Sequence, residues 1–288
     1  MARTILVTGA TGTVGGQVLL KLAGREGVDV RAAVRDPRSV AMAAANVTPV
    51  KFSYEDAATM QSACAGVDAV FWVAPVTQNM VELASAFLAA ASAAGVPHIV
   101  KLSVTGVDDP TPMLVAQWHR DMEAALRATG IPWTSLRPGG FMQNFLGNAA
   151  PRPDGNMYAP LGESKTSYID VRDIANVAVH CLTEPGHIGK AYEMTGPEAL
   201  TMTQVAAIIG EVSGRQIQFV DIPEEAARQA MLGAKMPSWM VEMILNIQAY
   251  SRNGHAEAVT STVKDVTGNA PITFRQFAWD NAKAWQTR

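Results

Sequence analysis

The chain has 288 residues, of which 48% are hydrophobic and 17% are charged, and its formal net charge is −3. A chain of this length and apolar content can bury a large core. The small net charge, with no Lys/Arg run longer than two residues, argues against a nucleic-acid binder, which needs clustered positive charge to neutralise phosphates. The 2 cysteines lie far apart and the 5 histidines show no ligand-like spacing, so we expect neither a disulfide framework nor a metal site.

The N-terminal residues pass directly into a strand pattern, without the apolar core and small-residue cleavage site of a signal peptide. The most apolar later segment, residues 80–95, carries Glu82 and is shorter than the roughly 20 residues that cross a bilayer. We therefore expect a cytoplasmic protein that binds neither membranes nor nucleic acids. The sequence leaves monomer and homodimer open.

Short runs of β-forming residues alternate with helical runs along the first two thirds of the chain. Strands are predicted at residues 4–8, 29–34, 47–53, 69–74, 98–103, 133–137 and 191–195. Helices are predicted between some of them, at residues 13–25, 79–94 and 113–129, because apolar residues recur there at every fourth position. Strict alternation of strand and helix predicts an α/β fold with a doubly wound parallel sheet of the Rossmann type.

The pattern changes after about residue 196. A helix at 202–212, one strand, further helical material and a closing helix near 273–285 predict a small C-terminal α/β lobe. We assign this lobe to residues 197–288, together with a proline- and glycine-rich excursion at 151–165 outside the sheet. The main sheet then occupies residues 1–150 and is completed by about 166–196.

A glycine motif joins the first predicted strand to the first predicted helix in the stretch TILVTGATGTVGGQVLLKL. Its G-x-x-G-x-x-G spacing permits a sharp turn, a close approach of backbone to pyrophosphate, and a helix N-terminus aimed at the phosphates. An ordinary turn is the alternative, but this position between strand and helix favours a dinucleotide site. Residues 1–150 are therefore predicted to be a dinucleotide-binding core. The expected coenzyme-binding residues of the loop are Gly9, Thr11, Gly12, Thr13, Val14 and Gly15.

The residues after the second predicted strand bear on the choice of coenzyme. Arg35 follows the strand directly and Arg38 lies three positions further on, and a guanidinium matches the geometry of a 2′-phosphate. Asp36 lies one place beyond the usual acidic position that accepts hydrogen bonds from an unphosphorylated ribose. The two arginines predict NADP(H), with a solvated surface pair as the alternative.

Further motifs occur in one order across almost the whole chain: VTGATGTVGG, VRDP, AGVDAVFWVAP, GVPHIVKLSVTG, LRPGGFMQN, YIDVRDIA and YEMTGPEALT. Together they resemble the NmrA-like branch of the short-chain dehydrogenase/reductase superfamily, and within it the reductases of triphenylmethane dyes, azo dyes and quinones. The resemblance implies an NAD(P)-binding Rossmann sheet, a small C-terminal lobe and a cleft between them. It also implies that Ala74 and Gly139 contact the coenzyme and that Phe141 and Asn144 border the substrate. For the segment from Gly139 to Asn144, a plain loop is the alternative.

The usual catalytic Tyr-x-x-x-Lys pair of that superfamily is absent. Counting back from Glu123, which matches a recurrent acidic position, His119 stands at the lysine position and Val115 at the tyrosine position. His119 either contacts the nicotinamide ribose, donates a proton, or is an ordinary polar helix residue. Ser103 ends the fifth predicted strand, where the superfamily keeps a hydroxyl that faces the substrate, so it is a second candidate catalytic residue. The alternative is an ordinary hydroxyl of a β/α turn, which is common at strand ends.

The missing tyrosine favours one class of electron acceptor. A quinone, azo dye or triphenylmethane dye spreads incoming negative charge over a conjugated system, so it depends less on a positioned acid than an isolated ketone does. We therefore predict an NADP(H)-dependent reductase of a conjugated small molecule. The resemblance leaves a non-catalytic NADP(H) sensor open, and a ketone or imine reductase that uses His119 as its acid is a third possibility.

Overall fold

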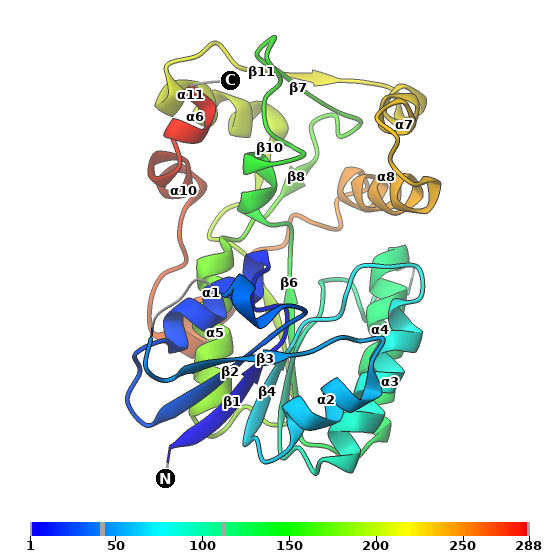
Figure 1. Cartoon of the computed structure of the whole chain (residues 1–288). Coiled ribbons are helices and arrows are strands. Elements are labelled where there is room, and N and C mark those ends of the chain that lie inside the picture. Colours follow the sequence, from blue (N-terminus) through cyan, green and yellow to red (C-terminus); the bar gives the residue numbers. More distant parts are fainter. Residues whose placement is uncertain (1, 41–43, 111–112, 287–288) are drawn as a thin grey trace. The chain divides into compact units, whose positions relative to one another are not determined.

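The structure is a computed structural model that describes residues 2–40, 44–110 and 113–286 (Figure 1). It divides into two compact units between which the chain passes several times. Unit 1 comprises Met1–Val104, Trp118–Arg137 and Val171–Tyr192, and unit 2 comprises Thr105–Gln117, Pro138–Asp170 and Glu193–Arg288.

A seven-stranded sheet forms the centre of unit 1. Its order is β3-β2-β1-β4-β5-β6-β9, and the pairs from β3 to β6 are parallel. The order reverses direction at β1, so the carboxyl end of β1 lies at the switch point where such sheets bind ligands. The fold class and all seven strands predicted from the sequence are confirmed. The strands are β1 (Arg3–Val7), β2 (Val28–Val34), β3 (Val47–Lys51), β4 (Ala69–Trp72), β5 (Ile99–Leu102), β6 (Trp133–Pro138) and β9 (Lys190–Met194).

Helices cover both faces of this sheet. α1 (Thr13–Leu22) packs against α5 (Val171–Thr183) on one face, and α2 (Ala57–Cys64), α3 (Met80–Ala93) and α4 (Leu114–Ala128) lie on the other (Figure 1). Because both faces are covered, the strands are nearly continuous apolar runs. Met122 and Leu126 of α4 join the core with Trp118 at its margin, as the spacing predicts, and the buried Glu123 lies beside them.

Unit 2 contains two small two-stranded sheets. β7 (Asn156–Ala159) pairs in parallel with β11 (Gln218–Asp221), and β8 (Lys165–Thr166) pairs antiparallel with β10 (Leu200–Thr201). β7 begins within the excursion predicted to lie outside the main sheet. The short 3-10 helix η2 (Met142–Leu146) and α6 (Met202–Ser213) contribute to a core with α10 (Phe274–Asp280) and α11 (Lys283–Gln286).

The remaining helices of unit 2 are α7 (Glu224–Gly233), α8 (Ser238–Arg252) and α9 (Thr262–Thr267), of which α7 and α8 pack together. The prediction of a single closing helix near 273–285 is wrong, because the structure has two helices there, α10 and α11. Between them, Asn281 Nδ2 donates to the carbonyl of Phe277. Among the described residues, no helix is long and apolar enough to span a bilayer. Both cysteines are free and buried.

Candidate functional site

The glycine loop after β1 is built by close backbone contacts. Gly9 has a positive φ of 61°, which L-residues with a side chain rarely adopt. The turn is closed by a hydrogen bond in which Gly12 N donates to Gly9 O at 2.8 Å. A Cβ on Gly15 would lie 2.2 Å from Gly9 O and 2.8 Å from Thr8 O, so only glycine allows α1 to start this close to the strand. Gly9 and Gly15 therefore each meet a backbone requirement of this turn.

The start of α1 fits a pyrophosphate. The first N–H groups of a helix have no acceptor within the helix, and Gly12, the N-cap, offers no side chain to accept from them. Thr11, Gly12 and Thr13 are exposed, whereas Val14 and Gly15 are buried and anchor the turn. The loop thus presents unpaired donors and the positive end of a helix dipole to an anion.

The two arginines after β2 lie in different settings. Arg35 is exposed and makes no ion pair with any residue that the structure describes. Arg38 instead holds Asp36 in a bidentate pair, with Nη2 2.9 Å from Oδ2 and Nε 3.0 Å from Oδ1. Hydrogen bonds from the Arg38 side chain and backbone lower the pKa of Asp36, so this carboxylate stays ionised. Asp36 also caps the short 3-10 helix η1 (Pro37–Ser39).

The residues after β4 border the same loop. β4 ends at Trp72, two residues earlier than the sequence predicts, and Val73 and Ala74 follow it. Val73 N donates to Thr8 Oγ1 at 2.8 Å, and a Cβ on Gly9 would lie 3.3 Å from Val73 Cβ. Ala74 is buried and directly follows this contact.

His119 on α4 has a partner that sequence reasoning missed. Lys101 lies in β5, is completely buried, and places its Nζ 2.8 Å from His119 Nδ1. The same Nζ lies 5.6 Å from the centroid of the Trp72 ring, and its other hydrogen-bond partner is the carbonyl of Leu102 at 3.4 Å. The sequence feature that could have revealed this pair is the lysine within the apolar strand IVKL, because charged residues are almost never fully buried without a partner.

Burial controls the ionisation of this pair. Burial lowers the pKa of Lys101 to about 7, with Glu123 opposing the shift and Arg137 and Arg127 adding to it. Burial, and then the positive charge of Lys101, lower the pKa of His119 well below its usual value. His119 is therefore neutral at pH 7, and Lys101 gives up its proton much closer to neutral pH than an ordinary lysine does.

Ser103 is held by a buried ion-pair cluster. Its hydroxyl donates to Glu123 Oε1 at 2.6 Å, and Arg137 donates through Nε to Oε1 at 3.1 Å and through Nη2 to Oε2 at 2.8 Å. Arg127 adds a contact at 2.7 Å from the helix surface. Burial alone would raise the pKa of Glu123, but the hydrogen bonds from Arg137 and Ser103 and the nearby positive charges lower it overall. The Ser103 proton is thus engaged by Glu123.

Three predicted residues belong to unit 2. Gly139 N donates to Met194 O at 2.9 Å, and a Cβ on Gly139 would lie 3.2 Å from Ser167 O. Phe141 forms a parallel bridge with Ile169 and is partly exposed. Asn144 lies in η2 and is exposed. The glycine at 139 is therefore needed for an approach to the chain's own backbone, and the roles of these three residues toward ligands stay predictions.

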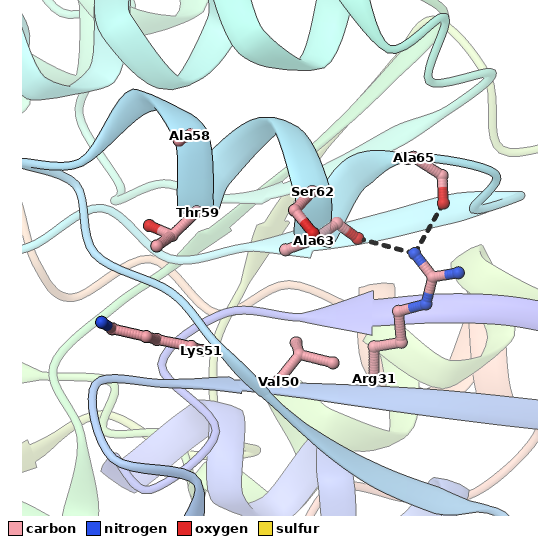
Figure 2. A pocket seen from close by; sticks show the side chains of 8 residues that line it. All are labelled: Arg31, Val50, Lys51, Ala58, Thr59, Ser62, Ala63 and Ala65. Atoms are coloured by element: carbon pink, nitrogen blue, oxygen red, sulfur yellow. Dashed lines mark hydrogen bonds between the residues drawn. The ribbon is translucent and has the colours of Figure 1, made fainter.

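One pocket of unit 1 lies away from all these residues. It has a volume of about 560 Å³ and lies between α2 and the β2–β3 edge of the sheet (Figure 2). Arg31 Nη1 donates to the carbonyls of Ala63 and Ala65 at 3.0 and 2.6 Å, so this guanidinium binds the C-terminal end of α2. Within the described ranges, no group of three or more His, Cys, Asp or Glu could hold a metal ion.

Comparison with known proteins agrees with this arrangement. Residues 1–273 match the NmrA-like family. An NAD(P)H azoreductase of Xenophilus azovorans is 38% identical and covers 98% of this chain and 99% of its own. A (4-alkanoyl-5-oxo-2,5-dihydrofuran-3-yl)methyl phosphate reductase of Streptomyces griseus is also 38% identical, over 98% of this chain and 99% of its own.

The same likeness extends to solved structures. An NADPH-dependent quinone oxidoreductase of Escherichia coli, solved with NADPH, superimposes with a TM-score of 0.85 at 28% identity and covers 96% of this chain and 98% of its own. Full-length relatives of this kind confirm the predicted class of NAD(P)H-dependent oxidoreductase. With its motifs, its sheet and its glycine loop in agreement, the chain belongs to the NmrA-like family.

Proposed function

We propose that this oxidoreductase uses NADPH to reduce a conjugated small molecule of the quinone or azo type. The observation that carries the proposal is the uncapped N-terminus of α1 behind a loop in which Gly15 admits no side chain. The acceptor class is supported by relatives that are named for an azo group, a quinone and an oxo-dihydrofuran, each of them a conjugated system.

The residues of unit 1 would hold the coenzyme as follows. The N–H groups at the start of α1 bind the pyrophosphate, and Arg35 binds the adenosine 2′-phosphate. When bound, the reduced nicotinamide supplies two electrons and one hydrogen to the acceptor. His119 would lie beside the ribose or the acceptor, and Ser103 would hold Glu123 and the α4 helix in place. From unit 2, Gly139, Phe141 and Asn144 would contribute to the coenzyme and substrate contacts.

An acceptor panel tests the function. Purified protein with NADPH and a set of quinones, azo dyes and triphenylmethane dyes should show acceptor-dependent loss of the reduced-nicotinamide absorbance band. Val115→Ala should retain turnover, because valine cannot transfer a proton, whereas Arg35→Ala should lose most of it at low NADPH. Tight NADPH binding with no oxidation across the panel would instead identify a coenzyme sensor.

The coenzyme preference is tested separately. Loss of paired contacts to a phosphate costs more than about 1.4 kcal/mol, so we expect NADPH to bind over tenfold more tightly than NADH. Calorimetric titration of both coenzymes measures the ratio, and Arg35→Ala should reduce it toward one. Equal affinities in the unmodified protein would contradict the NADP(H) assignment and would point to Asp36 as a ribose ligand.

A further inference from the structure

The sheet of unit 1 carries one lysine where an apolar residue is expected. Lys101 is completely buried between its strand neighbours Trp72 and Ser135. A buried ammonium normally needs a carboxylate partner, yet the hydrogen bonds of Lys101 Nζ go to a ring nitrogen and a carbonyl. An apolar side chain at position 101 would pack against Trp72 as well as a lysine does, so packing alone does not explain a lysine there.

The hydrogen bond between Lys101 and His119 fixes the state of the imidazole. An ammonium has only donors, so while Lys101 is protonated Nδ1 of His119 must accept. The neutral ring then carries its proton on Nε2. His119 is partly exposed, and Nε2 makes no hydrogen bond within the described ranges, so this nitrogen is the atom of the pair that a ligand can reach.

We propose that Lys101 and His119 form a proton relay that supplies the acceptor with the proton the missing Tyr-x-x-x-Lys pair would have provided. This inference rests on the proposed reductase function. It assigns the immediate donor to His119 and the proton store to Lys101, a residue that touches neither substrate nor coenzyme and acts through the imidazole.

The step is balanced as follows. A quinone or azo acceptor that has gained two electrons and one hydrogen is an anion that needs one proton. The Nε2–H bond of His119 breaks as the acceptor's O–H or N–H bond forms, while a proton moves from Lys101 Nζ to Nδ1. The imidazole stays neutral as its other tautomer, and Lys101 becomes a neutral amine. After the product leaves, one proton from water on Nε2 reverses the shift and restores the ammonium.

The charges around Lys101 suit this role. Glu123 favours its ammonium form, Arg137 and Arg127 disfavour it, and burial lowers its pKa to about 7. The neutral His119 and the Trp72 ring complete its surroundings. A group whose pKa lies near the working pH both holds a proton and gives it up readily, which is the optimum for a proton donor. An exposed lysine would hold its proton too firmly.

Kinetics of two lysine variants test the relay. Lys101→Met removes the proton, and Lys101→Arg keeps a donor for Nδ1 but cannot release a proton, since guanidinium has a pKa above about 12. On a quinone or azo acceptor that the unmodified protein reduces, both variants should lower kcat at least tenfold. Lys264→Met, at an exposed lysine of α9, is the matched control and should leave kcat unchanged. Full activity of Lys101→Arg would show that the lysine only positions the ring and would overturn the relay.

The choice of acceptor and pH sharpen this test. A cationic triphenylmethane dye becomes neutral without a proton, so Lys101→Met should slow its reduction less than that of the quinone or azo acceptor. In the unmodified protein kcat for the proton-requiring acceptor should fall as pH rises through about 7, because the ammonium is lost. An equal loss on both kinds of acceptor, or the same pH profile in Lys101→Met, would contradict the relay.

A spectroscopic measurement tests the pair without turnover. Two-dimensional ¹H–¹⁵N NMR of the histidine ring should show His119 as the Nε2–H tautomer below the pKa of Lys101, and a shift toward mixed tautomers above it. In Lys101→Met this pH-dependent change should vanish, with circular dichroism confirming that the variant is folded. An Nδ1–H tautomer in the unmodified protein would refute the relay. Absence of turnover across the whole acceptor panel, with the expected tautomer present, would refute the reductase proposal instead.

Discussion

Replacing Gly15 by alanine should weaken the start of α1, whereas the same change at Gly16 should not. A Cβ at Gly15 would lie 2.2 Å from Gly9 O, so the two atoms must separate by about 1.2 Å to reach the 3.4 Å of ordinary contact. The nearest atom to a Cβ at Gly16 is Ala10 O at 3.5 Å, which is ordinary contact. Both positions lie near the start of α1, so the two variants differ mainly in these close backbone contacts.

The magnitude follows from the two contacts. Overpacking of a tight site costs about 1–3 kcal/mol or more, and Gly→Ala in a helix gains about 0.5–1 kcal/mol where there is room. The two variants should therefore differ by roughly 2–4 kcal/mol in the free energy of unfolding, which is roughly 5–15 °C in Tm for a domain of this size. Thermal unfolding by circular dichroism and NADPH titration measure both effects. If Gly15→Ala proves as stable as Gly16→Ala and binds NADPH equally well, the close-packed loop described above is wrong.

Three further predictions concern the charged groups of unit 1. Glu123→Gln should cost about 3–5 kcal/mol because it breaks the buried ion pair with Arg137, and urea unfolding measures the loss. Because the folded protein lowers the pKa of Glu123, its ionised carboxylate stabilises the fold above the unfolded pKa of about 4.3, and this stabilisation is lost as pH falls through the folded pKa. A free energy of unfolding that does not fall with this acidification would contradict the ion-pair cluster. Lys101→Met should raise the free energy of unfolding at pH 7 and below. This gain should shrink as pH rises from about 7 toward the usual lysine pKa of 10.5, because over that range the unmodified folded protein binds fewer protons than its unfolded chain and so becomes more stable. A destabilised Lys101→Met variant at neutral pH would refute this reasoning.

The sequence predicts the sheet of unit 1 because its physical cause is local. Strands covered on both faces are apolar throughout, and their alternation with amphipathic helices permits few topologies. The small sheets of unit 2 escape this logic. β8 and β10 each contain two residues, which is too short for any periodicity, and β7 pairs with β11 about sixty positions away. Such pairings depend on tertiary packing, which no local pattern records.

The candidate site divides in the same way. The glycine loop could be predicted because each glycine answers a backbone requirement of one strand-to-helix turn. The link from Lys101 to His119 could not, since it depends on which face of β5 meets which face of α4. The sequence placed Ser103 at a strand end and Glu123 on a helix, but their hydrogen bond at 2.6 Å across twenty positions is a fact of packing. Lys101 was visible only as a charged residue in an apolar strand.

The lysine also illustrates a conflict between stability and function. An apolar side chain between Trp72 and the α4 helix would avoid the desolvation of an amine, so the folded protein carries a cost at neutral pH. Functional sites commonly hold groups that are unfavourable for folding. The carboxylate of Glu123 reduces that cost by favouring the ammonium, whereas the nearby Arg137 and Arg127 increase it.

A crystal structure of the protein with NADP⁺ and a slowly reacting quinone would test the central claim most directly. We expect the pyrophosphate at the N–H groups that follow Gly12, the 2′-phosphate beside Arg35, and the nicotinamide ribose or the quinone within hydrogen-bond distance of His119 Nε2. A coenzyme bound instead in the pocket lined by Arg31 and Lys51, or one whose pyrophosphate avoids the start of α1, would contradict the account.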